Sequence, residues 1–189
     1  MLDVVLCDQQ WLRCYEYQPK WLNDAEMTKY DNGGGNHMFV FFRGDDAIVK
    51  GFDHESPVSP HAREEFSVWP GIYVGVPGEL NSLLDDTAVE RDDVTFCIWH
   101  TSGQWHRGMM KFPRDEDDGS SYLLGTIHLD SGSYCDWALG YYGRELDPDL
   151  VASIYSGTSI RADLVAKLNP DRDITLAMSE LSEMACGYC

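Results

Sequence analysis

The residues of this chain that are best suited to chemistry are histidines and carboxylates in its first third. Asp53 and His54 are adjacent, and His37 and His61 lie before and after them in the sequence. Imidazole and carboxylate groups bind divalent metals, and they act as general acid and base in hydrolysis. The four residues are therefore a candidate hydrolase site. The simpler interpretation is that His54 satisfies main-chain groups of the loop that follows it.

A predicted hairpin would bring these groups together. Two β-rich runs flank Gly44-Asp45, which is a connection of the length that closes a hairpin. In that register His37 faces Phe52, and His54 follows the end of the second strand. We therefore expect the imidazoles and the nearby carboxylates at one rim of a sheet.

Other patterns give weaker indications. The glycines at 33–35 would let the main chain approach a ligand closely, but the ending of a phosphate-binding loop is missing, so we expect a turn. His100 and His106 flank a second predicted turn, with no acid beside them. Cys186 and Cys189 have C-x-x-C spacing without a second such pair, and their pairing or metal binding is left open. We expect no bound metal and no cofactor.

The charge balance constrains the partner. The chain has 14 Lys and Arg against 32 Asp and Glu, a formal net charge of −18 in 189 residues. Such a surface repels nucleic acid, phosphates and anionic lipid, and it attracts basic proteins or cations. With 43% hydrophobic residues the chain is expected to fold in spite of this charge. Neither a signal peptide nor a membrane-spanning run is recognised, so we expect a cytoplasmic protein without membrane contact.

Aromatic residues mixed with acids predict an interface for a basic partner. Tyr and Trp side chains are effective anchors, and acidic neighbours accelerate the approach of a cationic surface. The candidate partner-binding residues are Tyr15, Glu16, Tyr17, Trp21, Asp24, Glu26, Asp115, Glu116, Asp117 and Asp118. The alternative is that most of these rings belong to the core.

The order of the predicted elements, strands first and helices afterwards, indicates an α+β fold. We expect a single domain, residues 1–189, in which an N-terminal antiparallel sheet built of hairpins (mainly within 1–112) carries C-terminal helices (mainly within 120–189) packed on it. Strands are predicted at residues 2–6, 37–43, 46–52, 94–99 and 105–112, and helices after Asp8 and at residues 77–84, 133–142, 148–157, 159–168 and 171–187. Because residues 39–42 are apolar without alternation, their strand should be central and covered on both faces.

Three short segments resemble pieces of small acidic bacterial immunity proteins such as the SUKH superfamily. They are Asn32-Gly33-Gly34 before an aromatic strand, Trp69-Pro70-Gly71-Ile72-Tyr73, and the segment from Pro77 to Leu84. Their order differs from that superfamily, in which the proline-leucine helix precedes the Asn-Gly-Gly turn. Strong acidity is also shared with anti-nuclease and anti-CRISPR inhibitors, some of which mimic DNA. Both resemblances imply a bacterial or phage protein that covers a basic surface of another protein.

The leading hypothesis is therefore a non-catalytic inhibitor that binds a basic, nucleic-acid-handling protein: a nuclease, a toxin or a CRISPR effector subunit. It implies no direct binding to nucleic acid. The alternative is a metal-dependent hydrolase that uses His37, Asp53, His54 and His61. A third hypothesis is an acid-rich housekeeping protein whose charge maintains its solubility.

Overall fold

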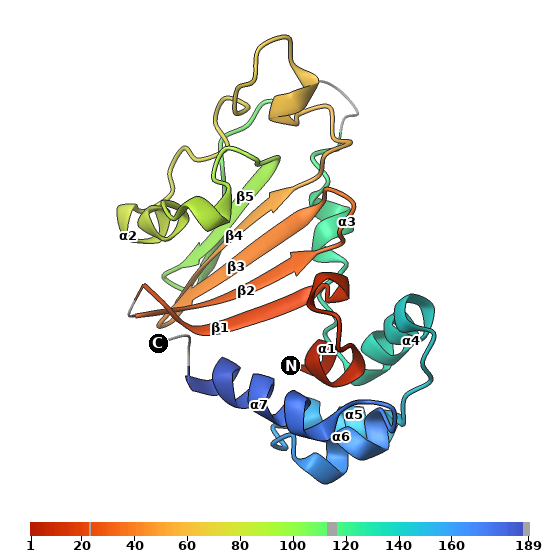
Figure 1. Ribbon diagram of the computed structural model, residues 1–189. Coiled ribbons are helices and arrows are strands. Elements are labelled where there is room, and N and C mark those ends of the chain that lie inside the picture. The colour runs from red at the N-terminus through yellow and green to blue at the C-terminus, as the bar shows by residue number, and fades with distance from the viewer. Residues whose placement is uncertain (23, 113–116, 187–189) are drawn as a thin grey trace. The chain divides into compact units, whose positions relative to one another are not determined.

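The computed structural model describes residues 1–22, 24–112 and 117–186, and it contains a six-stranded antiparallel sheet in the order β1-β2-β3-β4-β5-β6 (Figure 1). The strands are β1 (Tyr15–Trp21), β2 (Ala25–Asp31), β3 (His37–Arg43), β4 (Asp46–Phe52), β5 (Phe96–Thr101) and β6 (Gln104–Arg107). Helices dominate the C-terminal part. The predicted α+β class, with an N-terminal antiparallel sheet and C-terminal helices, is confirmed.

The chain divides into two compact units. One, the sheet unit, is the continuous segment Cys14–Thr126 and contains all six strands. The other, the helical unit, combines Met1–Arg13 with Ile127–Cys189. The first 13 residues therefore belong with the C-terminal helices and not with the strands that follow them.

The central hairpin has the register that its turn predicts. His37 pairs with Phe52 and Arg43 pairs with Asp46 across β3 and β4. Gly44, at φ +59°, occupies the left-handed region that such a tight connection requires. β3 lies in the interior of the sheet, as predicted.

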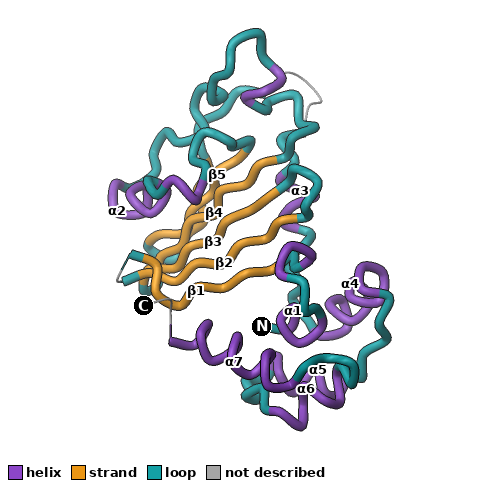
Figure 2. Tube along the Cα trace, viewed as in Figure 1, coloured by secondary structure: helices purple, strands orange, loops and turns teal. Residues whose placement is uncertain are grey.

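One face of the sheet carries the main hydrophobic core of the sheet unit. Phe39, Phe41 and Ile48 are at most 2% exposed, and they pack against leucines of α2 (Gly78–Asn81) and of the 3₁₀ helix η3 (Ser82–Leu84). These two elements form the helix predicted at residues 77–84. Both belong to the long connection between β4 and β5, which Figure 2 shows mainly as loop. The connection also contains the 3₁₀ helices η2 (Pro60–Ala62) and η4 (Thr87–Val89).

The opposite face of the sheet is covered only in part, which corrects the expectation for residues 39–42. Met38 is buried on that face, and the fully buried Leu123 belongs to α3 (Ser120–Leu124). Phe42, at the other end of β3, is 43% exposed. An apolar run without alternation therefore indicated the central position of the strand correctly but overestimated its burial.

The helical unit contains α1 (Leu2–Leu6), α4 (Ser131–Tyr142), α5 (Pro148–Tyr155), α6 (Ala162–Leu168) and α7 (Ile174–Cys186). α4 and α6 end where the following Gly and Pro residues predicted, and α5 ends two residues before Gly157. Gly143 ends α4 in the left-handed conformation, and Asp147 accepts hydrogen bonds from the first turn of α5. The cap of α4 is Asp130, and the helix begins at Ser131, two residues before the predicted start at residue 133.

Two predictions near the N-terminus are wrong. Residues 2–6 form helix α1 and not a strand, and the segment after Asp8 forms only the short 3₁₀ helix η1 (Gln10–Leu12) before β1 begins. The residues of α1 are buried on all sides, so their sequence has no helical period. Long-range partners decide the conformation: Asn169 and Arg172 donate hydrogen bonds to the carbonyls of residues 4–6.

Candidate functional site

The structure places two of the four candidate hydrolase residues on the core face of the sheet. The rings of His37 and His61 both lie against Phe52, with centroid separations of 5.2 Å and 5.8 Å. His37 is 6% exposed, and its Nε2 lies 3.0 Å from Nζ of Lys50. His61 is exposed, and its Nε2 lies 2.7 Å from a carboxylate oxygen of Asp93.

The other two residues have different surroundings. His54 Nδ1 lies 2.7 Å from the side-chain oxygen of Asn36, which also accepts a hydrogen bond from the His54 main chain. Asp53 accepts a hydrogen bond from the main chain of Glu55 and lies beside Gly119. Within the described residues, the hydrogen bonds and ion pairs of Asp53 and His54 do not include His37 or His61. Among the residues described, no three His, Cys, Asp or Glu side chains converge as the ligands of a metal ion.

The main chemical feature of the core face is Lys50, which sequence reasoning missed. This residue of β4 is 0% exposed, and Nζ donates hydrogen bonds of 2.8 Å to the carbonyls of Val89 and Glu90. Nζ has a third contact with His37 Nε2. A protonated lysine has three N–H donors, and these three contacts can use all of them. A single Lys among the otherwise apolar residues 47–52 was the available signal.

Burial controls the protonation of both partners. Desolvation lowers the pKa of Lys50 to about 7, against the opposing charges of Asp93 and Glu90. Desolvation, followed by the nearby charges of Lys50 and Lys29, lowers the pKa of His37 to about 4. His37 is therefore neutral at pH 7, and the hydrogen bonds of Lys50 fix Val89 and Glu90 to the sheet.

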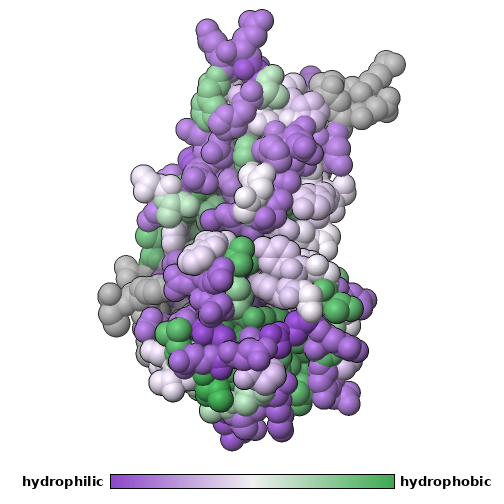
Figure 3. All heavy atoms as spheres, turned by 45° about the vertical axis from the view of Figure 1, so that its right-hand side comes forward, coloured by the Kyte–Doolittle hydropathy of each residue, from purple (hydrophilic) through white to green (hydrophobic). Residues whose placement is uncertain are grey.

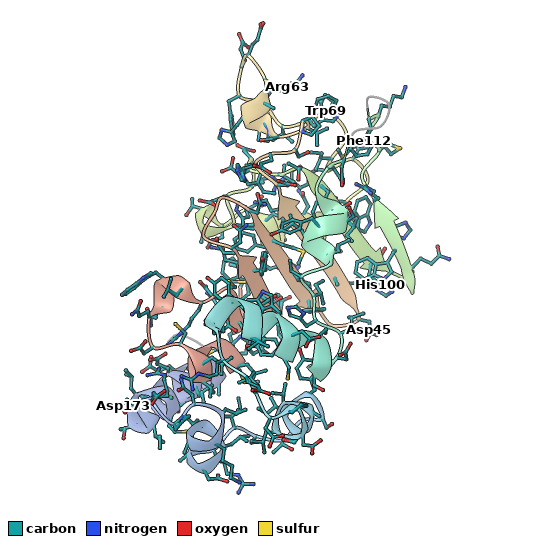
Figure 4. All side chains as sticks on the ribbon, turned by 90° about the vertical axis from the view of Figure 1, so that its right-hand side faces the viewer. Asp45, Arg63, Trp69, His100, Phe112 and Asp173 are labelled. Carbon is teal, nitrogen blue, oxygen red and sulfur yellow. The ribbon has the colours of Figure 1, made fainter. Side chains whose placement is uncertain are left out.

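The glycine-rich segment is a turn closed by its own side chains. Asp31 accepts a hydrogen bond from Gly33, and Asn32 accepts hydrogen bonds from the main chains of Gly34 and Asn36. The second turn is also confirmed, since β5 and β6 pair around Ser102-Gly103. His100 lies at this end of the sheet, with Nδ1 3.1 Å from the carbonyl of Asp45, and Figure 4 shows the two residues side by side.

The N-terminal group of candidate partner-binding residues is divided between core and surface. Trp21 is 8% exposed, and its indole donates a hydrogen bond to the carbonyl of Leu83. Tyr15 is half-buried and donates to the carbonyl of Thr126. Tyr17 donates a 2.7 Å hydrogen bond to Glu26, and desolvation, with that bond, raises its pKa to about 12. The exposed members are Glu16, Asp24 and Glu26.

The acidic loop of candidate residues is described only in part. Asp115 and Glu116 lie outside the described residues. Asp117 is exposed and accepts a hydrogen bond from the main chain of Gly119. Asp118 is 3% exposed and forms an ion pair with Arg107, so its carboxylate is neutralised within the protein.

A second acidic group, which sequence reasoning did not select, lies in the connection between β4 and β5. We call it the acidic rim; its exposed members are Glu79, Asp85, Asp86, Glu90 and Asp92. Arg91 fixes this segment, because its guanidinium bonds Asp85 at 2.5 Å and the side-chain oxygen of Asn81 at 2.9 Å. Arg43 donates a 2.6 Å hydrogen bond to the carbonyl of Glu79 and another, 2.9 Å long, to Asp24.

Seven of the Lys and Arg side chains in the described residues form ion pairs with carboxylates of the same chain. The pairs are Arg13 and Arg172 with Glu180, Lys29 with Asp31, Arg43 with Asp24, Arg91 with Asp85, Arg107 with Asp118, and Arg144 with Asp171. The surplus carboxylates are therefore exposed without a matching set of exposed cations. The face drawn in Figure 3 is correspondingly hydrophilic over much of its area.

The fold and these contacts define an α+β protein with a strongly acidic surface. Compared with models of protein families, with curated proteins and with solved structures, the chain gives no match in any of the three. The resemblance to SUKH-type immunity proteins and to anti-CRISPR inhibitors is not tested by these comparisons and stays a prediction. No helix in the described part of the chain has the length and apolar character needed to cross a membrane.

Proposed function

We propose that this protein is a non-catalytic binding module that inhibits a basic, nucleic-acid-handling protein by covering its cationic surface. The proposed partner is a nuclease, a toxin or a CRISPR effector subunit. The net charge of −18 supports this class of partner, because an anionic surface attracts cationic proteins and repels nucleic acid itself.

The proposal depends on one observation: the carboxylates of the acidic rim are exposed on a segment that arginines hold in place. Arginines such as Arg43 and Arg91 bond the main chain and side chains beneath the acidic rim, while the rim carboxylates of Glu79, Glu90 and Asp92 are exposed. A rigid array of carboxylates loses little conformational entropy when a cationic surface docks on it. The fixed segment is therefore better suited to binding than a mobile acidic tail.

The test is affinity capture followed by an inhibition assay. The tagged full chain is incubated with bacterial lysate at about 0.05 M and about 0.5 M NaCl, which differ strongly in charge screening. Captured proteins are then purified, and their binding to or cleavage of nucleic acid is measured with and without the chain. We expect basic partners that are lost at the higher salt concentration and are inhibited at the lower one.

Matched variants locate the surface. The rim variant combines Glu79→Gln, Glu90→Gln and Asp92→Asn, and the control combines Glu145→Gln, Asp149→Asn and Asp163→Asn, which are exposed acids of the helical unit. Both remove the same formal charge. We expect inhibition to weaken in the rim variant and to persist in the control. Equal weakening in both variants, or capture without any effect on nucleic-acid handling, would contradict the proposal.

A further inference from the structure

The two edges of the sheet differ in their protection. On β1, Pro19 lacks an N–H, Lys20 is exposed, and the pairing with β2 is irregular between Gln18 and Trp21. Proline, lysine and bulges are devices that prevent another strand from pairing with an edge. β6, at the opposite edge, has the sequence Gln-Trp-His-Arg with no proline and regular pairing to β5.

The β5–β6 register shows which main-chain groups of β6 point outward. The connection Ser102-Gly103, with φ values of +53° and +76°, closes a two-residue hairpin. Along an antiparallel ladder, residue pairs that exchange main-chain hydrogen bonds alternate with pairs that do not. Because Gly108 N–H donates to the carbonyl of Cys97, Gly108 belongs to a hydrogen-bonded pair, and Arg107 and Trp105 do not. The N–H and C=O groups of Trp105 and Arg107 therefore point away from β5.

This edge also differs from the rest of the chain in its charge. The segment 94–114 contains no Asp or Glu, although acids outnumber cations by 32 to 14 in the whole sequence. It presents Trp105, 60% exposed, and Met109, 72% exposed. An edge that exposes these two apolar side chains and has no acid, on an otherwise anionic protein, is a surface at which like-charged molecules can approach each other.

We propose that β6 is a self-association edge, at which β6 of a second copy pairs antiparallel about a two-fold axis through His106. In this register Trp105 faces Arg107 of the second copy, and Arg107 faces Trp105 of the second copy. All four outward groups of each strand segment find partners, because each Trp–Arg pair exchanges two main-chain hydrogen bonds. The two six-stranded sheets become one continuous sheet.

Side-chain geometry favours a second copy over an unrelated strand. Directly opposite residues on one face have their Cβ atoms about 4.5–5.5 Å apart, which brings each Trp105 ring within reach of a guanidinium. Arg107 already stacks in this way, 5.4 Å from the ring centroid of Phe112. The self-complementary arrangement satisfies the symmetry that a two-fold interface requires.

Sedimentation velocity of the full chain tests the proposal. Because two bodies of charge −18 repel each other, dimerisation should strengthen when NaCl rises from about 0.05 M to about 0.5 M, by about tenfold or more in the dissociation constant. Binding to a basic partner has the opposite salt dependence, so the two proposals fail separately. A chain that stays monomeric at all concentrations and at both salt concentrations would overturn the inference.

Two variants and a residue-level measurement identify the edge. Trp105→Lys should weaken the dimer at least tenfold, while Gln18→Lys, the same charge change on β1, should leave it unchanged. In hydrogen exchange followed by NMR, the amides of Trp105 and Arg107 should become protected as protein concentration rises. Within the described part of the chain, these are the amides of β6 that have no partner in the monomer. A dimer that survives Trp105→Lys, or protection confined to other segments, would show that the contact lies elsewhere.

Discussion

At the scale of single residues, the protein buries a lysine where its sequence offers an apolar strand. Lys50 joins β4 to the carbonyls of Val89 and Glu90. Burial, together with the nearby charge of Lys50, lowers the pKa of His37 and keeps it neutral. Glu90 itself has a φ of +50°, a conformation that is unfavourable for a residue with a side chain. The contacts of Lys50 thus stabilise a strained turn at the base of the acidic rim.

The lowered pKa of Lys50 predicts how stability depends on pH. The folded-state pKa is about 7 and the ordinary value is 10.5, so the unfolded chain binds more protons between these limits. The free energy of unfolding should therefore gain a contribution that rises with pH above 7. In urea denaturation at pH 7 to about 9, the free-energy difference between wild type and Lys50→Met should increase with pH.

The control for this measurement is Lys167→Met, because Lys167 is exposed. The free energy of unfolding of Lys167→Met, plotted against pH, should run parallel to that of the wild type. Comparing each variant with the wild type removes the opposite trend of Cys97 and Tyr73, whose pKa values are raised by burial. If the Lys50→Met profile also runs parallel to the wild type, the amine is not desolvated in the folded state.

At the scale of elements, the packing of β4 against β5 depends on a missing side chain. Gly51 pairs directly with Phe96, and a Cβ built on Gly51 would lie 2.1 Å from the Phe96 ring. Phe96 is 0% exposed, so its ring cannot move into solvent. The glycine is needed here for close approach and not for an unusual φ.

Gly51→Ala should therefore lower the free energy of unfolding by about 1–3 kcal/mol, the typical cost of overpacking a core. The matched change Gly78→Ala lies at the start of α2, where a Cβ meets no atom within 4 Å. That variant should be neutral or more stable, because alanine restricts the unfolded chain. Chemical denaturation of both variants makes the comparison, and equal effects would mean that the ring of Phe96 has room to move.

Local sequence signals predicted the elements whose ends are set by local chemistry. Gly44-Asp45 determined the register of β3 and β4, and Gly143 determined the end of α4. α1 could not be predicted in this way, because its helical form depends on residues more than 160 positions away. The positions of the candidate hydrolase residues could be predicted only in part for a related reason. The register placed His37 correctly, but His54 contacts Asn36, which local signals did not indicate.

At the scale of the whole molecule, surplus negative charge opposes folding. Exposed carboxylates repel one another in the compact state, and salt screens this repulsion. Screening also weakens surface ion pairs, but with 32 acids and 14 cations the repulsion dominates. Differential scanning fluorimetry should show a melting temperature that rises by several degrees between about 0.02 M and about 0.5 M NaCl. A falling melting temperature would mean that the ion pairs outweigh the repulsion.

The assembly of the helical unit from both ends of the described chain has a consequence for the order of synthesis. The sheet unit is one uninterrupted stretch, so it can acquire its structure while the ribosome is still translating. Helix α1 is made before the sheet unit, and the side chains that bond its carbonyls, Asn169 and Arg172, are made after it. During translation the residues of α1 therefore remain without these native hydrogen-bond partners until the whole sheet unit has been made.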